Sequence, residues 1–182
     1  MNRAIKFKLK NGKVVVIRRT RGTDYEDIMK FFEKFTHGSG AIQTFQYAGQ
    51  PKKDKEQSIK LYEDPNNLFI SVWDGKNVVG TCSITKKRPK HPYCMGTTAD
   101  IGMTVLDKYT HNGIGSKFFD ICEKWARANG VHKMQAGVRH NNIPSIANCI
   151  KHGFIITGIE YDEVFINGKW LHHYMVEKIL EN

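Results

Sequence analysis

Residues 99–130, ADIGMTVLDKYTHNGIGSKFFDICEKWARANG, decide the fold of this chain. The first seven predict a strand, and a polar loop then leads to Gly113-Ile114-Gly115. From there apolar residues recur every three or four positions, which predicts an amphipathic helix that stops at Asn129-Gly130. A glycine pair at a helix entry leaves backbone N–H groups open at the positive end of the helix, where phosphates bind. The sequence therefore predicts a phosphate-binding loop between a strand and a helix.

The segments around this stretch predict a mixed α/β fold. Two hairpins are expected upstream, around Asn11-Gly12 and around residues 74–77. Helices are expected from Thr23 or Asp24 to about Phe35, and from Asp54 onward, with an irregular loop or a weak helix over residues 37–51. Downstream we expect a strand at 132–138, a short helix ending at Gly153, and a strand pair around Asn167-Gly168. Mostly antiparallel strands with one parallel crossover through the central helix give a mixed, mostly antiparallel central sheet with flanking helices.

Length and composition favour one domain over residues 1–182, with residues 1–13 as an extra N-terminal hairpin arm. No apolar run reaches the roughly 20 residues that span a bilayer, and the N-terminus lacks a signal-peptide core. The four cysteines are widely spaced and the eight histidines show no ligand spacing, so we expect neither a metal site nor disulfides. These features predict a cytoplasmic protein without a membrane partner.

The net charge of +10 raises the hypothesis of nucleic-acid binding. The basic residues are scattered, however, with only short clusters at 18–21, 52–55 and 86–90. A solvated basic surface explains this distribution better than a nucleic-acid site. The same charge would attract an anionic cofactor.

Three phosphate-loop templates compete for Gly113-Ile114-Gly115. A Walker A loop fails because Lys108 stands where its first glycine belongs, and a dinucleotide fingerprint fails because Phe118 replaces its third glycine. The [Q/R]xxGxG/A loop of the GNAT acetyltransferase superfamily fits, except that Thr110 replaces Gln or Arg. Asn142, eleven residues before Gly153-Phe154, also matches that family. From about residue 14 to 180 the chain resembles GNAT proteins, and residues 163–170 look like the closing hairpin of the spermidine and small-amine branch.

The resemblance implies an acetyl-CoA-dependent N-acetyltransferase that uses no metal. The acceptor would be a primary amine of a small, amino-acid-like or polyamine-like molecule, which attacks directly in a ternary complex. The resemblance leaves room for a homodimer. The cofactor-binding residues that it implies are Met103, Thr104 and Val105 along the pantetheine arm, His111, Asn112, Gly113, Ile114, Gly115 and Ser116 around the pyrophosphate, and Asn142 beside the arm or holding the adjacent chain. A backbone N–H of the strand would stabilise the developing oxyanion.

The attacking amine must first lose a proton, and a carboxylate whose pKa is suitably raised can accept it, directly or through water. Asp100 is the first candidate for this base, because it lies on the strand that leads into the site; the alternative is a surface or structural carboxylate. Glu160, Asp162 and Glu163 are further candidates, either as base or as the binding site of a cationic acceptor.

The leaving thiolate in this family often receives a proton from a tyrosine seven residues after the motif asparagine. Cys149 stands at that position here. Its thiol, with an ordinary pKa of about 8.5, matches the CoA thiol, so Cys149 is the candidate acid. The alternative is a small apolar residue of the core. Tyr109 and Tyr161 are other candidates for this role.

Two further functions remain in view. One is acetylation of a protein N-terminus or lysine. The other is a non-catalytic acyl-CoA-binding module, which the departures at Thr110 and Cys149 would permit.

Overall fold

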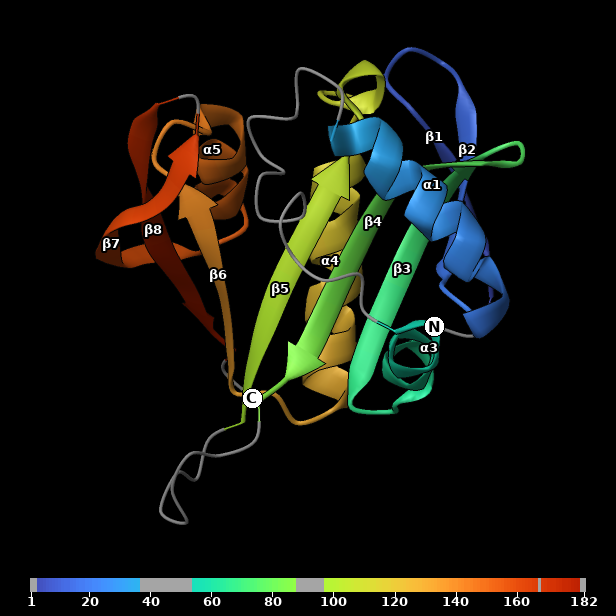
Figure 1. The fold of residues 1–182 in the computed structure, drawn as a ribbon. Coiled ribbons are helices and arrows are strands. Elements are labelled where there is room, and N and C mark those ends of the chain that lie inside the picture. The colour runs from blue at the N-terminus through green and yellow to red at the C-terminus, as the bar shows by residue number, and fades with distance from the viewer. Residues whose placement is uncertain (1–2, 37–53, 88–96, 167, 181–182) are drawn as a thin grey trace. The chain divides into compact units, whose positions relative to one another are not determined.

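The computed structural model describes residues 3–36, 54–87, 97–166 and 168–180 (Figure 1). These residues form eight strands in the sheet order β1-β2-β3-β4-β5-β6-β8-β7. Of the pairs whose register is defined, β5 with β6 is parallel, and β1 with β2, β2 with β3, β6 with β8 and β7 with β8 are antiparallel. The predicted mixed, mostly antiparallel α/β fold is confirmed.

The chain divides into two compact units. The first comprises Met1–Ile84 and Met103–Phe118, and the second comprises Thr85–Gly102 and Phe119–Asn182. The sequence prediction of a single domain stays a prediction. Within the described residues, no helix is long and apolar enough to cross a membrane.

Two hairpins build the strands of the first unit. Strands β1 (Ile5–Lys8) and β2 (Val14–Arg19) turn at Gly12, which has a φ of 86°. Strands β3 (Asn67–Asp74) and β4 (Asn77–Lys86) turn at Gly75, with a φ of 58°. Glycine adopts these positive angles without a steric penalty, which is why both predicted hairpins form where they do.

Two helices accompany these strands. Helix α1 (Tyr25–Thr36) begins after a short 3-10 turn, η1 (Gly22–Asp24), so neither Thr23 nor Asp24 opens it directly. The reason is that Asp24 turns inward: its carboxylate accepts the backbone N–H of Arg21 at 2.8 Å and pairs with the Arg18 guanidinium at 2.6 Å. Helix α3 (Lys55–Glu63) begins at the predicted cap, since Asp54 accepts the N–H of Glu56 at 3.2 Å.

The core of the first unit lies between α1 and the strands. Ile28 and Phe31 of α1 bury their side chains against Val78 of β4, with Trp73 and Leu106 packed around them. Figure 1 shows α1 lying across this part of the sheet. Ile28 and Phe31 are three positions apart, so they lie on one face of the helix, and this is the face that it buries. Residues 37–51, predicted to be an irregular loop or a weak helix, lie outside the described residues.

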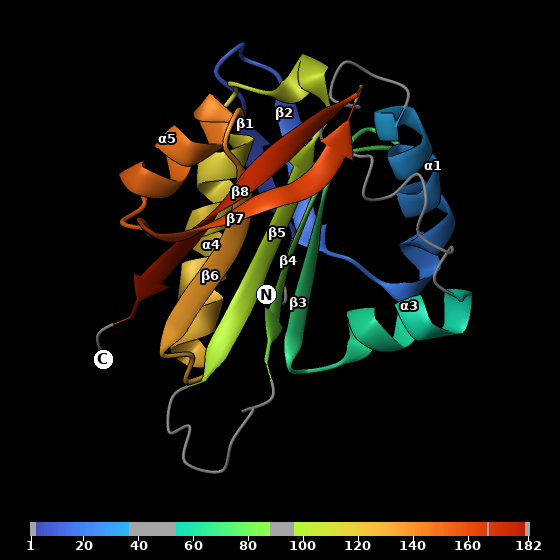
Figure 2. The same ribbon diagram turned by 60° about the vertical axis from the view of Figure 1, so that its left-hand side comes forward.

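The second unit is built around the long hairpin of β7 (Ile155–Ile166) and β8 (Lys169–Ile179), which Figure 2 shows beside helix α5 (Ile143–Lys151). Strand β8 pairs with β6 (Lys133–Arg139), and β6 pairs with the beginning of β5 (Thr98–Val105). Helix α4 (Ile114–Ala128) supplies the parallel crossover and contributes Phe119, whose ring packs on His152 and Phe154.

Candidate active site

The loop before α4 adopts a conformation suited to an anion. After a 3-10 turn, η3 (Asp107–Tyr109), His111 takes a φ of 60° and Gly113 a φ of 90°. Lys117 N–H donates to Gly113 O at 3.0 Å, so α4 starts directly after Gly113. The N–H groups of Ile114 and Gly115 therefore belong to the first turn, which offers them no carbonyl within the helix. Left-handed residues beside a helix N-terminus form a concave array of backbone donors, which fits a pyrophosphate.

Asn112 fixes the middle of this loop. Its Oδ1 accepts the backbone N–H of Asn11 at 3.2 Å, and its Nδ2 donates to Thr110 O at 2.9 Å. The Thr110 hydroxyl donates to Asp107 O at 2.7 Å. Threonine thus satisfies its hydroxyl within the preceding turn, at the position where the family motif has Gln or Arg.

Tyr109 forms the buried base of the loop. Its side chain is 8% exposed, and its hydroxyl donates to Asp74 Oδ2 at 2.5 Å. Lys13 forms an ion pair with the same carboxylate, and the hydrogen bonds from Lys13 and Tyr109 lower the pKa of Asp74. Burial, followed by the bond to Asp74, raises the pKa of Tyr109. The Tyr109 hydroxyl is therefore committed to Asp74 and is a poor proton donor for a thiolate.

Met103, Thr104 and Val105 form the end of β5 in the first unit, and all three are half-buried. Strand β4 runs close beside them: a Cβ at Gly80 would lie 3.3 Å from Thr104 O, tighter than nearly all such contacts. Leu106 N–H donates to Val79 O at 3.0 Å, which continues the pairing with β4. The predicted contact of these three residues with the pantetheine arm stays a prediction.

Asp100 lies in the second unit, where the pairing between β5 and β6 ends. The parallel register runs from Thr98 with Lys133 to Asp100 with Gln135, although β6 continues to Arg139. The Asp100 side chain is 48% exposed, and its carboxylate lies 3.0 Å from Lys87 Nζ. Beyond Asp100 the register gives β5 no partner in β6, and such an edge can accept a ligand as an added strand.

Asn142 and Cys149 both belong to α5 and its cap. Asn142 Oδ1 accepts the N–H of Ser145 at 3.3 Å, so Asn142 is the N-cap of α5 and holds the adjacent chain. Cys149 is 2% exposed, and burial raises the pKa of its thiol to about 11. This environment favours the core alternative for Cys149. The pKa of its thiol is higher than that of the CoA thiol, so proton transfer from Cys149 to the CoA thiolate would cost free energy.

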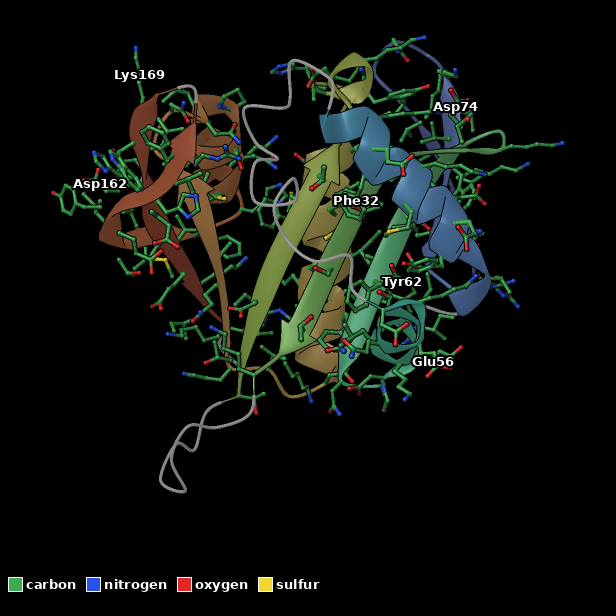
Figure 3. The ribbon with its side chains drawn as sticks, viewed as in Figure 1. Phe32, Glu56, Tyr62, Asp74, Asp162 and Lys169 are labelled. Atoms are coloured by element: carbon green, nitrogen blue, oxygen red, sulfur yellow. The ribbon has the colours of Figure 1, made fainter. Side chains whose placement is uncertain are left out.

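The acidic residues of β7 gather at an irregularity of the strand. Glu160, Asp162 and Glu163 are exposed, and the register with β8 shifts between Glu160 and Val164. Asp162, labelled in Figure 3, has a φ of 52° and donates its backbone N–H to His172 Nδ1 at 3.0 Å. Tyr161 is 72% exposed. Among the described residues, no group of three or more His, Cys, Asp or Glu side chains is placed to hold a metal ion.

The sequence did not single out the partners of the loop. Phe7, Asn11, Lys13 and Asp74 contact it from hairpins that were predicted only as secondary structure. Asn11 and Asn112 are 101 positions apart, and no local pattern signals such a contact. The tight Asn-Gly turn was the only available sign that this end of the hairpin has a fixed geometry.

Solved structures share this fold. A GNAT-family acetyltransferase from Streptococcus pneumoniae is 20% identical with a TM-score of 0.76, over 91% of this chain and 99% of that one. Salmonella typhimurium yncA, solved with its cofactor acetyl-CoA, is 20% identical with a TM-score of 0.74, over 92% and 94%. A ribosomal-protein-alanine N-acetyltransferase from Brucella melitensis is 22% identical with a TM-score of 0.71, over 90% and 99%. No curated protein matches the chain significantly.

The family comparison covers the loop described above. The model of the acetyltransferase (GNAT) family matches residues 27–154, which include the loop, Asp100, Asn142 and Cys149. This range is most of the 182-residue chain. The chain therefore belongs to the GNAT family of acetyltransferases, enzymes whose acetyl donor is acetyl-CoA.

Proposed function

We propose that this enzyme transfers the acetyl group of acetyl-CoA to a primary amine of a small molecule, by direct attack in a ternary complex. The observation that carries the proposal is the loop at residues 110–116, where His111 and Gly113 have positive φ angles at the start of α4. Residues 111–116 would hold the pyrophosphate, and the end of β5, at Met103, Thr104 and Val105, would align the pantetheine arm. Acetyl-CoA supplies an acetyl group activated as a thioester.

Asp100 is the proposed base. An ordinary amine has a pKa of about 10 and is charged at neutral pH, so it must lose a proton before its nitrogen can attack. Asp100 is half-exposed and lies where β5 loses its pairing with β6. In the free enzyme its partner is the Lys87 ammonium. A cationic acceptor would take the place of Lys87, and the carboxylate would accept its proton, directly or through a water molecule, as the nitrogen bonds to the acetyl carbon.

The thiolate would leave without help from Cys149 or Tyr109. Burial raises the pKa of Cys149 to about 11, and the Tyr109 hydroxyl is hydrogen-bonded to Asp74. A thiol with a pKa of about 8.5 is a sufficiently good leaving group to depart as the anion and take its proton from solvent.

The acidic residues of β7 support a cationic acceptor. Glu160, Asp162 and Glu163 are exposed in a chain with a net charge of +10, so they create a local negative field on a basic protein. A singly charged, amino-acid-like amine meets less repulsion from the rest of the protein than a polyamine does. This argument favours a small monoamine over spermidine.

A substrate panel tests the proposal by measuring release of the CoA thiol from acetyl-CoA. The panel contains monoamines, amino acids, spermidine and peptides with a free N-terminal alanine, the last because one structural neighbour acts on ribosomal-protein alanine. Turnover on a small amine supports the proposal. Turnover on peptides alone would show a protein acetyltransferase, and CoA binding without turnover on any acceptor would show a non-catalytic module.

A further inference from the structure

We infer that the N-terminal β1–β2 hairpin is part of the cofactor site, and that Phe7 and Asn112 are positioning residues that hold the loop in its binding conformation. The inference rests on the proposed role of residues 111–116 in holding the pyrophosphate. Three separate contacts in the first unit support it.

The first contact is the amide of Asn112. It accepts the N–H of Asn11 at 3.2 Å with one atom and donates to Thr110 O at 2.9 Å with the other. The hairpin turn is itself stiff, since Asn11 Oδ1 accepts the N–H of Lys13 at 3.1 Å. One side chain thus joins the first residue of the loop to a rigid turn far away in the sequence.

The second contact is the ring of Phe7. Its Cζ lies 3.5 Å from the position that a Cβ at Gly113 would occupy, so the ring packs against the loop at this glycine. Phe7 is paired across the hairpin with Val15, which is 1% exposed. The position of the ring is therefore set by the hairpin and not by the loop.

The third contact is the Lys13–Asp74–Tyr109 group. Lys13 lies just before β2, Asp74 ends β3, and Tyr109 directly precedes the loop. Figure 3 shows Asp74 beside the β1–β2 hairpin. The hairpin consequently holds the chain both before His111, at Tyr109, and after it, at Asn112 and Gly113.

These contacts have a consequence for affinity. A left-handed φ is energetically unfavourable for a residue that has a Cβ. His111, at a φ of 60°, therefore needs stabilising contacts from neighbouring residues to keep this conformation. With the hairpin in place the backbone donors are arranged before the ligand arrives, and binding need not order them. Loss of the contacts would weaken CoA binding without changing the groups that touch CoA.

Calorimetric titration with CoA tests the inference. Phe7→Ala and Asn112→Ala should each raise the Kd for CoA about five- to twentyfold, and Phe7→Leu should restore most of the affinity. Val14→Ala, on the opposite face of the same hairpin, and Asn66→Ala, whose side chain donates to nearby Asp64, are the matched controls and should bind as the wild type does. The Tm of each variant without CoA shows whether it folds.

Gly113→Asp separates this inference from the proposed function. A carboxylate at this position should abolish CoA binding if the loop holds the pyrophosphate, and unchanged binding would overturn the proposed placement of the cofactor. If Gly113→Asp fails to bind CoA while Phe7→Ala and Asn112→Ala bind it normally, the loop remains the proposed pyrophosphate site, but the positioning role of Phe7 and Asn112 is wrong. The positioning role is also wrong if Val14→Ala raises the Kd for CoA as much as Phe7→Ala does.

Discussion

The ammonium of Lys87 lies 3.0 Å from the carboxylate of Asp100, at the last residue pair that β5 shares with β6. The ion pair therefore lies at the point where the pairing of β5 with β6 ends. Both side chains are close to half-exposed, so the pair exchanges partners at little cost. The proposed base is thus held by a displaceable cation, which suits the proposed reaction, in which the second substrate is itself a cation.

Asp100→Asn should lower kcat by about two to four orders of magnitude at neutral pH, because the amide cannot accept a proton from the acceptor. The Kd for CoA should stay unchanged. Stopped assays of thiol release with the best acceptor of the panel measure the first quantity, and calorimetry measures the second. Lys87→Ala is the control, since it removes the ion pair but keeps the base. Wild-type kcat in Asp100→Asn would exclude it as the base.

Cys149→Ala should leave kcat and its pH dependence as in the wild type and lower the stability by about 1 kcal/mol, as for a small side chain lost from a core. The reason is the burial that raises the thiol pKa to about 11. Cys122→Ala, a second buried cysteine, provides the comparison. A basic limb of the pH–rate profile that disappears in Cys149→Ala, but not in Cys122→Ala, would make Cys149 the acid.

Asp24→Asn should destabilise the protein by about 3 kcal/mol at pH 7, because it leaves the Arg18 guanidinium partly buried without a counter-charge. Burial raises the pKa of Asp24, but the hydrogen bonds from Arg18 and Arg21 outweigh it and the folded pKa lies below 3.8. A depressed folded pKa means that the stabilisation is complete above 3.8 and is lost as the pH falls through the folded value.

Urea unfolding over a range of pH checks this expectation. The difference in stability between the wild type and Asp24→Asn should shrink as the pH falls below about 4. Asp27→Asn serves as the control, since its side chain is 43% exposed in a 3.5 Å pair with Lys30, and it should change stability by less than about 0.5 kcal/mol. A difference that stays constant down to pH 2 would contradict the assignment.

Asn142→Ala should cost about 1 kcal/mol of stability, the usual loss for an N-cap, and leave the Kd for CoA within about twofold of the wild type. The side chain already accepts the N–H of Ser145. Asp54→Ala, which removes the N-cap of α3, is the matched variant and should destabilise to a similar degree. A large rise in the Kd for CoA in Asn142→Ala alone would show that this side chain binds the cofactor arm.

The sequence predicted the features that depend on neighbouring residues. Turns with glycine at positive φ, the cap at Asp54 and the helix that begins at Gly113-Ile114-Gly115 all lie where local pattern put them. The 3-10 turn before α1 was missed because it depends on Arg18 drawing Asp24 inward. The support of the loop by Phe7 and Asn11, and the ion pair of Asp100, were missed for the same reason: their partners are distant in the sequence.

Strand β7 ends the sheet order and carries exposed apolar side chains: Ile155, Ile156, Ile159, Tyr161 and Phe165. A long, flat strand of this kind would be a template for intermolecular pairing. The left-handed Asp162 and the shifted register interrupt it, and Glu160, Asp162 and Glu163 place charges at the break. We therefore expect the irregular, acidic middle of β7 to oppose the pairing of this edge with identical edges of other molecules when the protein is concentrated.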